Sequence, residues 1–540
     1  MNRAFITGAV VVLSLIACES ASPSASEQAS GSPVAADQVL RMAFFEVPTL
    51  DPTITIDPTV SLLLRGLTWF DEDLRTVPGL AESWEVTEGG TQITFSLREA
   101  SYSSGEPIVA EDFVFGWKRL LDPRNEAWVP YLLAEVVGAS ELLALIDADL
   151  PPDEEIEALL GGLGVFAPDD RTLEVTLTRP AAHFVTAVSN PALAPVPEDW
   201  ITEPGATEAG GYWSSGPFVL TEWVHDQRRT LEPNPMWWGE PISLERIEMR
   251  AFPSEEEALD SFRGGEIDIV DLSGPPADSE VAAATIETAG PSIWHIDFDM
   301  TRPDSPLATN RSLREALSLA VDREELNQVV GFGGPVAGSP IPPGVPGHDP
   351  ELVSVFDIDA ARIRLDDALS ELGLNGPEEL DLTFLHGTMV GDGPRYLEQQ
   401  WREGLGVEVT FTGLEPDQFL ELVPLHEYDM FWIRWFADFP HPQSFLEPPW
   451  ACAAALNLSG YCNSELDSQL ASAAATTDEA DQLELYAEAQ RILVGDAAHV
   501  FLQWPAEYTV VSPRVSGLIA TPFDPLYGLM FPERIRIVAD

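Results

Sequence analysis

The chain has 540 residues, of which 45% are apolar, and its 89 acidic against 28 basic residues give a formal net charge of −61. This length exceeds what one hydrophobic core usually spans, and it predicts a globular protein of about two or three domains. The charge argues against a nucleic-acid partner, because phosphate binding requires a basic surface, and no internal apolar run approaches the roughly 20 residues that cross a bilayer.

The first eighteen residues have the pattern of a secretory signal. Met1 to Arg3 form a short positive end, residues 4–16 are almost wholly apolar, and the letters LIAC follow at 15–18. A small residue before a cysteine resembles a bacterial lipobox, which predicts that Cys18 becomes the lipidated first residue of the mature protein. An ordinary cleaved signal with a cysteine nearby is the alternative.

A tether is predicted for residues 19–37. This stretch is rich in Ser, Ala, Pro and Gly and has few large apolar side chains, so it cannot pack against a core. A lipid, a flexible tether and a large body together predict a protein of the periplasm or of the outer face of the cytoplasmic membrane. The lipid is its expected membrane attachment.

Strand-like and helix-like segments alternate from about residue 38, as in an α/β protein. Residues 92–99 (QITFSLRE) and 172–179 (TLEVTLTR) alternate apolar and polar side chains, which predicts half-buried strands. Residues 313–326 (LREALSLAVDREEL) and 481–494 (DQLELYAEAQRILV) have apolar residues three and four apart, which predicts amphipathic helices. The proline-rich stretch 334–350 is predicted to be either a connection or a surface loop with a role.

Cys452 and Cys462 are the two thiols that remain if Cys18 is lipidated. An exported protein is in an oxidising environment, so we predict that these two form a disulfide. Free thiols or a metal site are the alternatives, although two cysteines alone do not make a metal site.

Catalytic signatures are absent from the sequence. It has no phosphate-binding GxxxxGK[ST] and no GxSxG, and the HE pair at 426–427 lacks the second histidine that zinc would need. The eight histidines show no ligand spacing. We therefore predict no enzyme, no cofactor and no metal. A catalytic carboxylate pair would be hidden among so many acids, whose two interpretations are a solvated acidic exterior and a field that steers cationic ligands.

Several separated stretches stand in a recognisable order along the chain. They are FFEVPTLDP (44–52), the long run from GLAESW to RLLDP (79–123), SSGPFVLTEW (214–223), FRGGEIDIV (262–270), LREALSLAVDRE (313–324) and NLSGYCNSELDSQL (457–470). Together they resemble the large solute-binding proteins of ABC importers, in the peptide/nickel class typified by oligopeptide- and dipeptide-binding proteins. The resemblance covers nearly all of 38–540.

The resemblance implies an α/β, periplasmic-binding-protein type II fold, with two lobes that close by a hinge and an extra α/β domain. It implies that the first lobe is assembled from pieces distant in sequence. The expected division is 38–58, 185–290 and 510–540 for lobe I, 59–184 for the extra domain and 291–509 for lobe II. The implied partners are a short peptide, an ABC permease and its ATPase, and we expect a monomer.

Asp438, in the stretch RWFADFPHPQSF (434–445), stands where the family's aspartate receives the α-ammonium group of a peptide. The preceding Arg434, Trp435 and Phe436 would offer backbone groups to the ligand, as in β-strand addition. A loop-capping role is the alternative for Asp438, and core packing is the alternative for the two aromatic residues. The resemblance implies further backbone contacts from the first lobe at Glu46 and Val47.

Two residues depart from the family's pattern. Phe115 stands where a tyrosine is common in the oligopeptide binders, so a hydroxyl contact from that position is lost. Trp432 stands where an arginine helps to bind the ligand's carboxylate. Arg434 either compensates for that loss or pairs with one of the many acids. Nickel chelates, haem and oligosaccharides are alternative ligands, since the fold alone does not identify a peptide.

Overall fold

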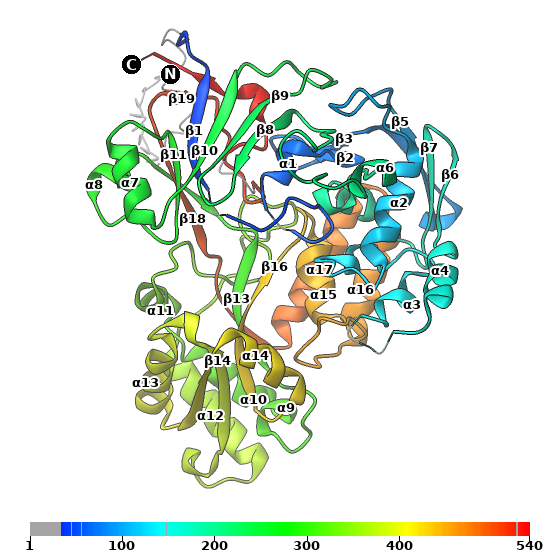
Figure 1. Cartoon of the computed structure of the whole chain (residues 1–540). Helices are drawn as coiled ribbons and strands as arrows, with labels where there is room; N and C mark the ends of the chain where they lie inside the picture. Colours follow the sequence, from blue (N-terminus) through cyan, green and yellow to red (C-terminus); the bar gives the residue numbers. More distant parts are fainter. Residues whose placement is uncertain are drawn as a thin grey trace, which may run out of the picture.

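The structure is a computed structural model that describes residues 34–539 except 45, 56, 147, 149 and 525–527. Cys18, the predicted signal and most of the predicted tether lie outside the described residues. The described part is a mixed α/β arrangement, as the sequence predicts, with one large sheet at the top of Figure 1, a second at the bottom and a third at the right. None of its helices is long and apolar enough to cross a membrane.

The first large sheet has seven strands in the order β12, β18, β11, β1, β10, β9, β8. Its central strand β1 (Val39–Phe44) pairs in parallel with β10 (Arg246–Ala251) and β11 (Ile269–Leu272), so residues more than 200 positions apart lie side by side. The other strands are β8 (Phe218–Val224), β9 (Arg228–Pro233), β12 (Thr285–Ala289) and β18 (Ala506–Val511). Helices α7 (Glu255–Arg263) and α8 (Ser279–Ala283) lie beside this sheet (Figure 1).

The second large sheet has five strands in the order β15, β14, β16, β13, β17. Every residue of its strand β13 (Ser292–Phe298) is buried. The other strands are β14 (Leu382–Gly387), β15 (Val409–Leu414), β16 (Met430–Phe436) and β17 (His499–Gln503). The surrounding helices are α9 (Pro306–Thr309), α10 (Arg311–Leu319), α11 (Arg323–Val330), α12 (Ile358–Leu372), α13 (Gly393–Leu405) and α14 (Pro416–Leu422).

Two short segments connect the large sheets. The chain passes from β12 to β13 through Gly290 and Pro291, and from β17 to β18 through Trp504 and Pro505. The backbone N–H of Gly290 donates a 2.8 Å hydrogen bond to the carbonyl of Pro505, so the two crossings lie side by side. Paired short crossings of this kind are where a hinge between two lobes is expected.

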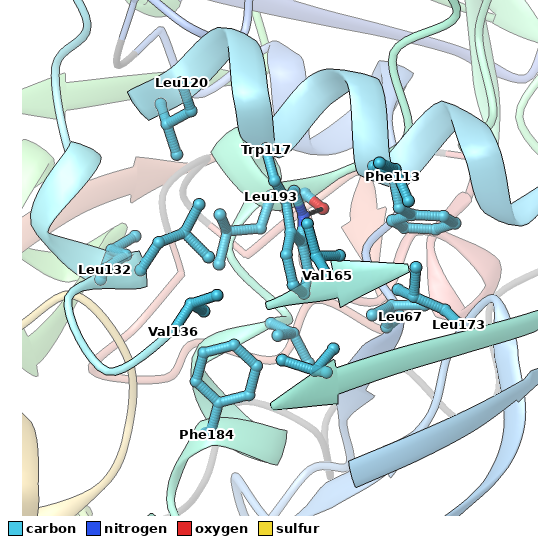
Figure 2. Close-up of a cluster of buried hydrophobic side chains, with 14 of the residues drawn as sticks. Leu67, Phe113, Trp117, Leu120, Leu132, Val136, Val165, Leu173, Phe184 and Leu193 are labelled. Atoms are coloured by element: carbon cyan, nitrogen blue, oxygen red, sulfur yellow. Dashed lines mark hydrogen bonds between the residues drawn. The ribbon is translucent and has the colours of Figure 1, made fainter. Parts of the chain in front are cut away.

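The third sheet belongs to the region at the right of Figure 1. Its antiparallel strands are β4 (Ala81–Thr87), β5 (Gln92–Leu97), β7 (Thr172–Thr176) and β6 (Val165–Asp169), in that order. Helix α2 (Ala110–Leu121) buries Phe113 and Trp117 against it, and Figure 2 shows the resulting hydrophobic cluster. The indole N–H of Trp117 donates to the carbonyl of Leu193 at 3.1 Å, so its one polar group is satisfied inside the core.

Three helices from residues 442–495 pack against that same region, beside α2 in Figure 1. They are α15 (Pro442–Trp450), α16 (Ser464–Ala475) and α17 (Glu479–Gly495). Arg179 forms an ion pair with Glu447 of α15, and Ala182 N–H donates to the carbonyl of Ala474 at 2.8 Å. These contacts hold α15 and α16 against the chain that follows β7 of the third sheet.

The remaining elements are short. They include α1 (Val60–Leu63), α3 (Ala139–Leu143), α4 (Asp153–Gly161), α5 (Phe184–Ala187) and α6 (Glu198–Ile201). The pairs β2 (Thr68–Phe70) with β3 (Thr76–Pro78), and β19 (Val515–Ser516) with β20 (Arg536–Ile537), form two-stranded sheets.

The local predictions hold with one exception. Strand β5 lies within 92–99, β7 within 172–179, and α17 contains 481–494. The single helix predicted for 313–326 is wrong, because the chain forms α10 and then α11. Asp322 ends the continuity: its side chain accepts the N–H of Glu325 and so caps a new helix, a role for which aspartate is well suited.

Cys452 and Cys462 form a disulfide, with an S–S distance of 2.07 Å. The stretch 334–350 contains neither helix nor strand apart from a single bridge between Val336 and Gln503. The domain boundaries predicted above stay predictions.

Candidate functional site

A cavity of about 580 Å³ lies where the two large sheets and the third region meet. Its walls come from chain segments that are far apart in sequence. They include Asp57 and Trp69, Trp128 and Asn190, Asp271 near the end of β11, Arg434 to Asp438 at the end of β16, Ala506 and Glu507 at the start of β18, and Phe523 to Asp524.

Asp438 is held in this wall by three hydrogen bonds. Its backbone N–H donates to the hydroxyl of Ser444 at 2.9 Å, and its carbonyl accepts from the side-chain amide of Asn190 at 3.4 Å. The hydroxyl of Tyr131 donates to its Oδ1 at 2.8 Å. Ser444 reaches the loop because α15 begins at Pro442, where a proline is well accommodated in the first helical turn.

The carboxylate of Asp438 has no cationic partner among the described residues. Burial raises the pKa of Asp438 to about 6, and the hydrogen bond from Tyr131 only partly opposes that rise. A carboxylate removed from water without a counter-charge is costly, and a bound cation would relieve that cost. The geometry therefore provides a place for one positively charged group.

Strand β16 has a free edge beside Asp438. It pairs with β13 along its whole length, from Met430 to Phe436, but with β14 only from Met430 to Trp432. Ala437 N–H donates to the carbonyl of Pro291 at 2.9 Å. Because bonding groups alternate along an antiparallel pair, the N–H and C=O groups of Arg434 and Phe436 point away from β13. Beyond Trp432 that side of the strand has no pairing strand among the described residues.

Side chains alternate along the same segment. Arg434 and Phe436 line the cavity, and Phe436 is 54% exposed. Trp435 points elsewhere: it packs against the cluster under α15 to α17, and its indole N–H donates to the carbonyl of Ser444 at 2.8 Å. The side chain of Trp435 therefore packs in the core, as the alternative prediction had it, and only its backbone belongs to strand β16.

The guanidinium of Arg434 is fixed by neutral groups. Its Nε and one terminal nitrogen donate to the hydroxyl of Ser292 at 3.0 and 2.8 Å, and its Cζ lies 4.1 Å from the ring centroid of Phe436. Burial lowers the pKa of Arg434 to about 10, while Glu507 opposes that shift. No carboxylate of the described chain forms an ion pair with Arg434, so the alternative that it pairs with an acid is not what the structure has.

Glu46 and Val47 do not line the cavity in this structure. One oxygen of Glu46 accepts the indole N–H of Trp223 at 3.0 Å and lies 3.3 Å from Nδ1 of His225. Val47 packs against the hydrophobic cluster of the seven-stranded sheet. Both side chains are therefore engaged by residues in or beside the seven-stranded sheet.

Phe115 and Trp432 also lie away from the cavity. Phe115 packs against the cluster of the seven-stranded sheet, and Trp432 is only 2% exposed within the core of the other large sheet. Neither side chain lines the cavity, so neither is placed to contact a ligand there.

Most residues in and around the cavity were not predicted from the sequence, and four of them bear on how it can bind a ligand. Trp128 and Asn190 line its wall, Tyr131 bonds to Asp438, and Glu507 faces it from β18. None of them stands in a pattern that a single sequence reveals. Asn190 and Tyr131 contact Asp438 although they lie 248 and 307 positions away from it in sequence.

In the part of the chain that the structure describes, no group of three or more His, Cys, Asp or Glu side chains is arranged to hold a metal ion. The cavity offers hydrogen-bonding groups, aromatic walls and charge, which suits binding of an organic ligand.

Comparison with known proteins places this geometry in a family. The model of the bacterial extracellular solute-binding proteins, family 5 (middle), matches residues 75–457. The chain is 27% identical over 483 residues to the dipeptide-binding protein DppE of Bacillus subtilis (strain 168), covering 85% of this chain and 84% of that protein. It is 29% identical over 506 residues to the periplasmic oligopeptide-binding protein OppA of Escherichia coli (strain K12), covering 89% of each.

A solved structure shows the same fold. The unliganded open form of the periplasmic murein tripeptide-binding protein MppA superimposes with a TM-score of 0.78 at 24% identity, over 95% of this chain and 99% of that one. The fold class predicted from the sequence is confirmed: it is that of the type II periplasmic binding proteins.

Proposed function

The chain belongs to family 5 of the bacterial extracellular solute-binding proteins, and on that premise we propose that it captures short peptides and delivers them to an ABC permease. Proteins of this family are extracytoplasmic, non-enzymatic components of transport systems. Peptide as the ligand of this chain, and the residues that hold it, are the proposal.

The observation that carries the proposal is the carboxylate of Asp438 beside the free edge of β16. A peptide has an α-ammonium group at one end and a chain of backbone donors and acceptors behind it. In the proposed complex the peptide's ammonium group supplies the counter-charge that Asp438 lacks, and the two groups form a charge-assisted hydrogen bond. The backbone of Arg434 and Phe436 then pairs with the peptide backbone.

This division of tasks explains how one site accepts many peptides. Backbone hydrogen bonds do not depend on side-chain identity, whereas an ammonium partner fixes direction and register. The exposed rings of Phe436 and Trp128 offer apolar walls that contact varied side chains without demanding one shape.

Closure about the two crossings beside Gly290 and Pro505 is part of the proposal. Closing would bring the seven-stranded sheet toward the peptide, and the backbone at Glu46 and Val47 is proposed to join the contacts then. The lobe boundaries, at 38–58, 185–290 and 510–540 for lobe I and 291–509 for lobe II, are proposed on the same grounds, with 59–184 as the extra domain.

Attachment and partners are inferred from the sequence. The LIAC pattern supports a lipid on Cys18 and a tether over 19–37, which would keep the protein at the outer face of the cytoplasmic membrane. A permease and its ATPase are the proposed partners of a monomer.

The proposal is tested by calorimetric titration of the purified mature protein with mixed tripeptides. Binding is expected for free peptides and should be lost in N-acetylated ones, which have no ammonium group. Asp438→Ala should abolish binding, while Asp366→Ala, which removes an exposed carboxylate on α12, should not. Equal affinity of Asp438→Ala and the parent would overturn the assignment of the ammonium site.

Native mass spectrometry of the freshly isolated protein provides a second test. A distribution of masses that match short peptides is the expected result. A metal chelate, haem or an oligosaccharide in the cavity would replace the peptide proposal by another solute of the same fold.

A further inference from the structure

The cavity has a strong excess of negative charge. Its described lining contains five acidic residues, Asp57, Asp271, Asp438, Glu507 and Asp524, and one basic residue, Arg434. If every acid were satisfied within the protein, this excess would carry no information about the ligand. The partners of each carboxylate therefore decide what the charge means.

Four of these acids have partners. Asp57 forms a 2.6 Å ion pair with the buried Arg229, and Asp438 accepts from Tyr131. One oxygen of Asp524 accepts the backbone N–H of Met530 at 3.1 Å, and Asp271 is not free either.

Glu507 differs from the other four. It is the second residue of β18, just beyond the crossing from the five-stranded sheet, and its side chain is half-buried. Neither of its oxygens has a hydrogen bond, and it forms no ion pair within 4 Å, among the described residues. Its Oε1 lies over Gly290, where a Cβ atom would come within 3.1 Å of it, so the glycine makes room for the carboxylate.

Arg434 is close enough to favour the ionised form of Glu507 electrostatically, but the two form no ion pair within 4 Å. The guanidinium is held on the hydroxyl of Ser292 and on the ring of Phe436 instead. A half-buried carboxylate without a bonded partner is unfavourable in the empty protein. It becomes favourable when a ligand brings a cation.

We propose that Glu507 selects peptides with a basic side chain, lysine or arginine, by pairing with that side chain inside the cavity. The inference rests on the proposed function, because it takes the ligand to be a peptide. Asp438 binds the ammonium group that every peptide has, whereas Glu507 binds a cation that only some peptides have. Asp438, two positions after β16, and Glu507, on β18, line the same cavity, so one extended ligand can contact both.

The aromatic wall suits such a side chain. Trp128 and Phe436 are 58% and 54% exposed and line the same cavity. The methylene stem of a lysine or arginine buries well along such rings while its charged end reaches a carboxylate. Acidic side chains should be rejected, because they would be placed among the carboxylates of the lining.

The test compares calorimetric affinities for tripeptides that differ in one side chain. Lysine is placed at each of the three positions of trialanine, and norleucine, glutamate or alanine replaces it in matched peptides. Norleucine keeps the apolar stem without the charge. At one position at least, lysine is expected to bind about tenfold or more tightly than norleucine, the size of a charge-assisted hydrogen bond.

Glu507→Gln should reduce this lysine-to-norleucine ratio to less than about twofold while leaving the affinity for trialanine within about threefold of the parent. Glu287→Gln is the matched control: it removes one negative charge from an exposed position on the neighbouring strand β12 and should leave the ratio unchanged.

The outcomes separate the two proposals. If the parent binds no peptide at all, the proposed function fails. If it binds peptides with equal affinity for lysine and norleucine at every position, the proposed function stands and the role of Glu507 is overturned. If Glu507→Gln weakens all peptides equally, the residue acts on Arg434 or on the fold, and the selection of basic side chains is again overturned.

Discussion

The hydroxyl of Tyr131 donates a 2.8 Å hydrogen bond to Oδ1 of Asp438, across 307 positions of sequence. Tyr131 belongs to the region of the third sheet, and Asp438 follows the last residue of β16 by two positions. This bond holds one carboxylate oxygen and leaves the other without a protein partner among the described residues. The raised pKa of Tyr131 has burial as its first cause and the nearby carboxylate as its second, so this hydroxyl stays protonated and donates.

Tyr131→Phe should weaken peptide binding by about tenfold, because the carboxylate loses the hydrogen bond that orients it. Titration calorimetry with trialanine measures the change. Tyr396→Phe is the matched control. Tyr396, on α13, also donates to a carboxylate, that of Glu325 at 2.7 Å, but it does not line the cavity. An unchanged affinity in Tyr131→Phe would show that the backbone contacts alone position Asp438.

Peptide affinity should fall as the pH drops below about 6. The ammonium group binds the ionised form of Asp438, and the pKa of Asp438 is about 6 in the empty protein. Below that pH the carboxyl group must lose a proton before the ligand can bind. The decrease is at most about tenfold for each pH unit below that value. Titrations at pH 4.5, 5.5 and 7.5 measure it. Affinity that stays constant over this range would contradict the assignment of the ligand's ammonium group to Asp438.

Asp438→Asn should make the ligand-free protein more stable at pH 8 than the parent. The folded-state pKa of Asp438 is raised above its ordinary value, so ionisation destabilises the fold. That cost is absent below about pH 4, where the carboxyl is neutral in both states. It grows between about 4 and 6 and is complete above. Melting temperatures of both proteins at pH 4 and pH 8 check this, and a Tm difference that does not grow with pH would contradict it.

Replacing Cys452 and Cys462 by serine should lower the free energy of unfolding by about 2–3 kcal/mol, because the disulfide closes a loop between two cysteines ten positions apart in sequence. Denaturant unfolding of the parent and the double variant measures the difference. Reducing agent should destabilise the parent to the level of the variant and leave the variant unaffected. A parent that is insensitive to reduction would show that other contacts hold this loop.

N-methylation of a peptide's backbone should reveal the free edge of β16. Only those ligand N–H groups that face Arg434 and Phe436 donate to the strand, so methylating one amide should weaken binding about tenfold and methylating its neighbour should not. A series of singly methylated tetra-alanines tests this by calorimetry. Equal effects at all positions would contradict strand pairing.

The sequence by itself was sufficient for the fold class, the likeness to the solute-binding family and several local elements. Strands β5 and β7 follow from alternation, and α17 from apolar residues three and four apart, because these patterns depend on neighbours in the chain. The disulfide was predicted because two thiols remained in an oxidising environment. The break between α10 and α11 was missed, since the apolar period continues across Asp322 while its capping bond does not show in that period.

Only the tertiary structure decided what surrounds Asp438. The bond from Tyr131, the carbonyl contact of Asn190 and the place of Glu507 on the opposite sheet join residues that no local period connects. It also separated four predicted residues from the cavity: Phe115, Val47 and Trp432 pack in hydrophobic clusters, and the carboxylate of Glu46 bonds to Trp223. A sequence pattern reports which face of an element is apolar. The site depends on which distant faces meet, and that is determined by packing between sheets.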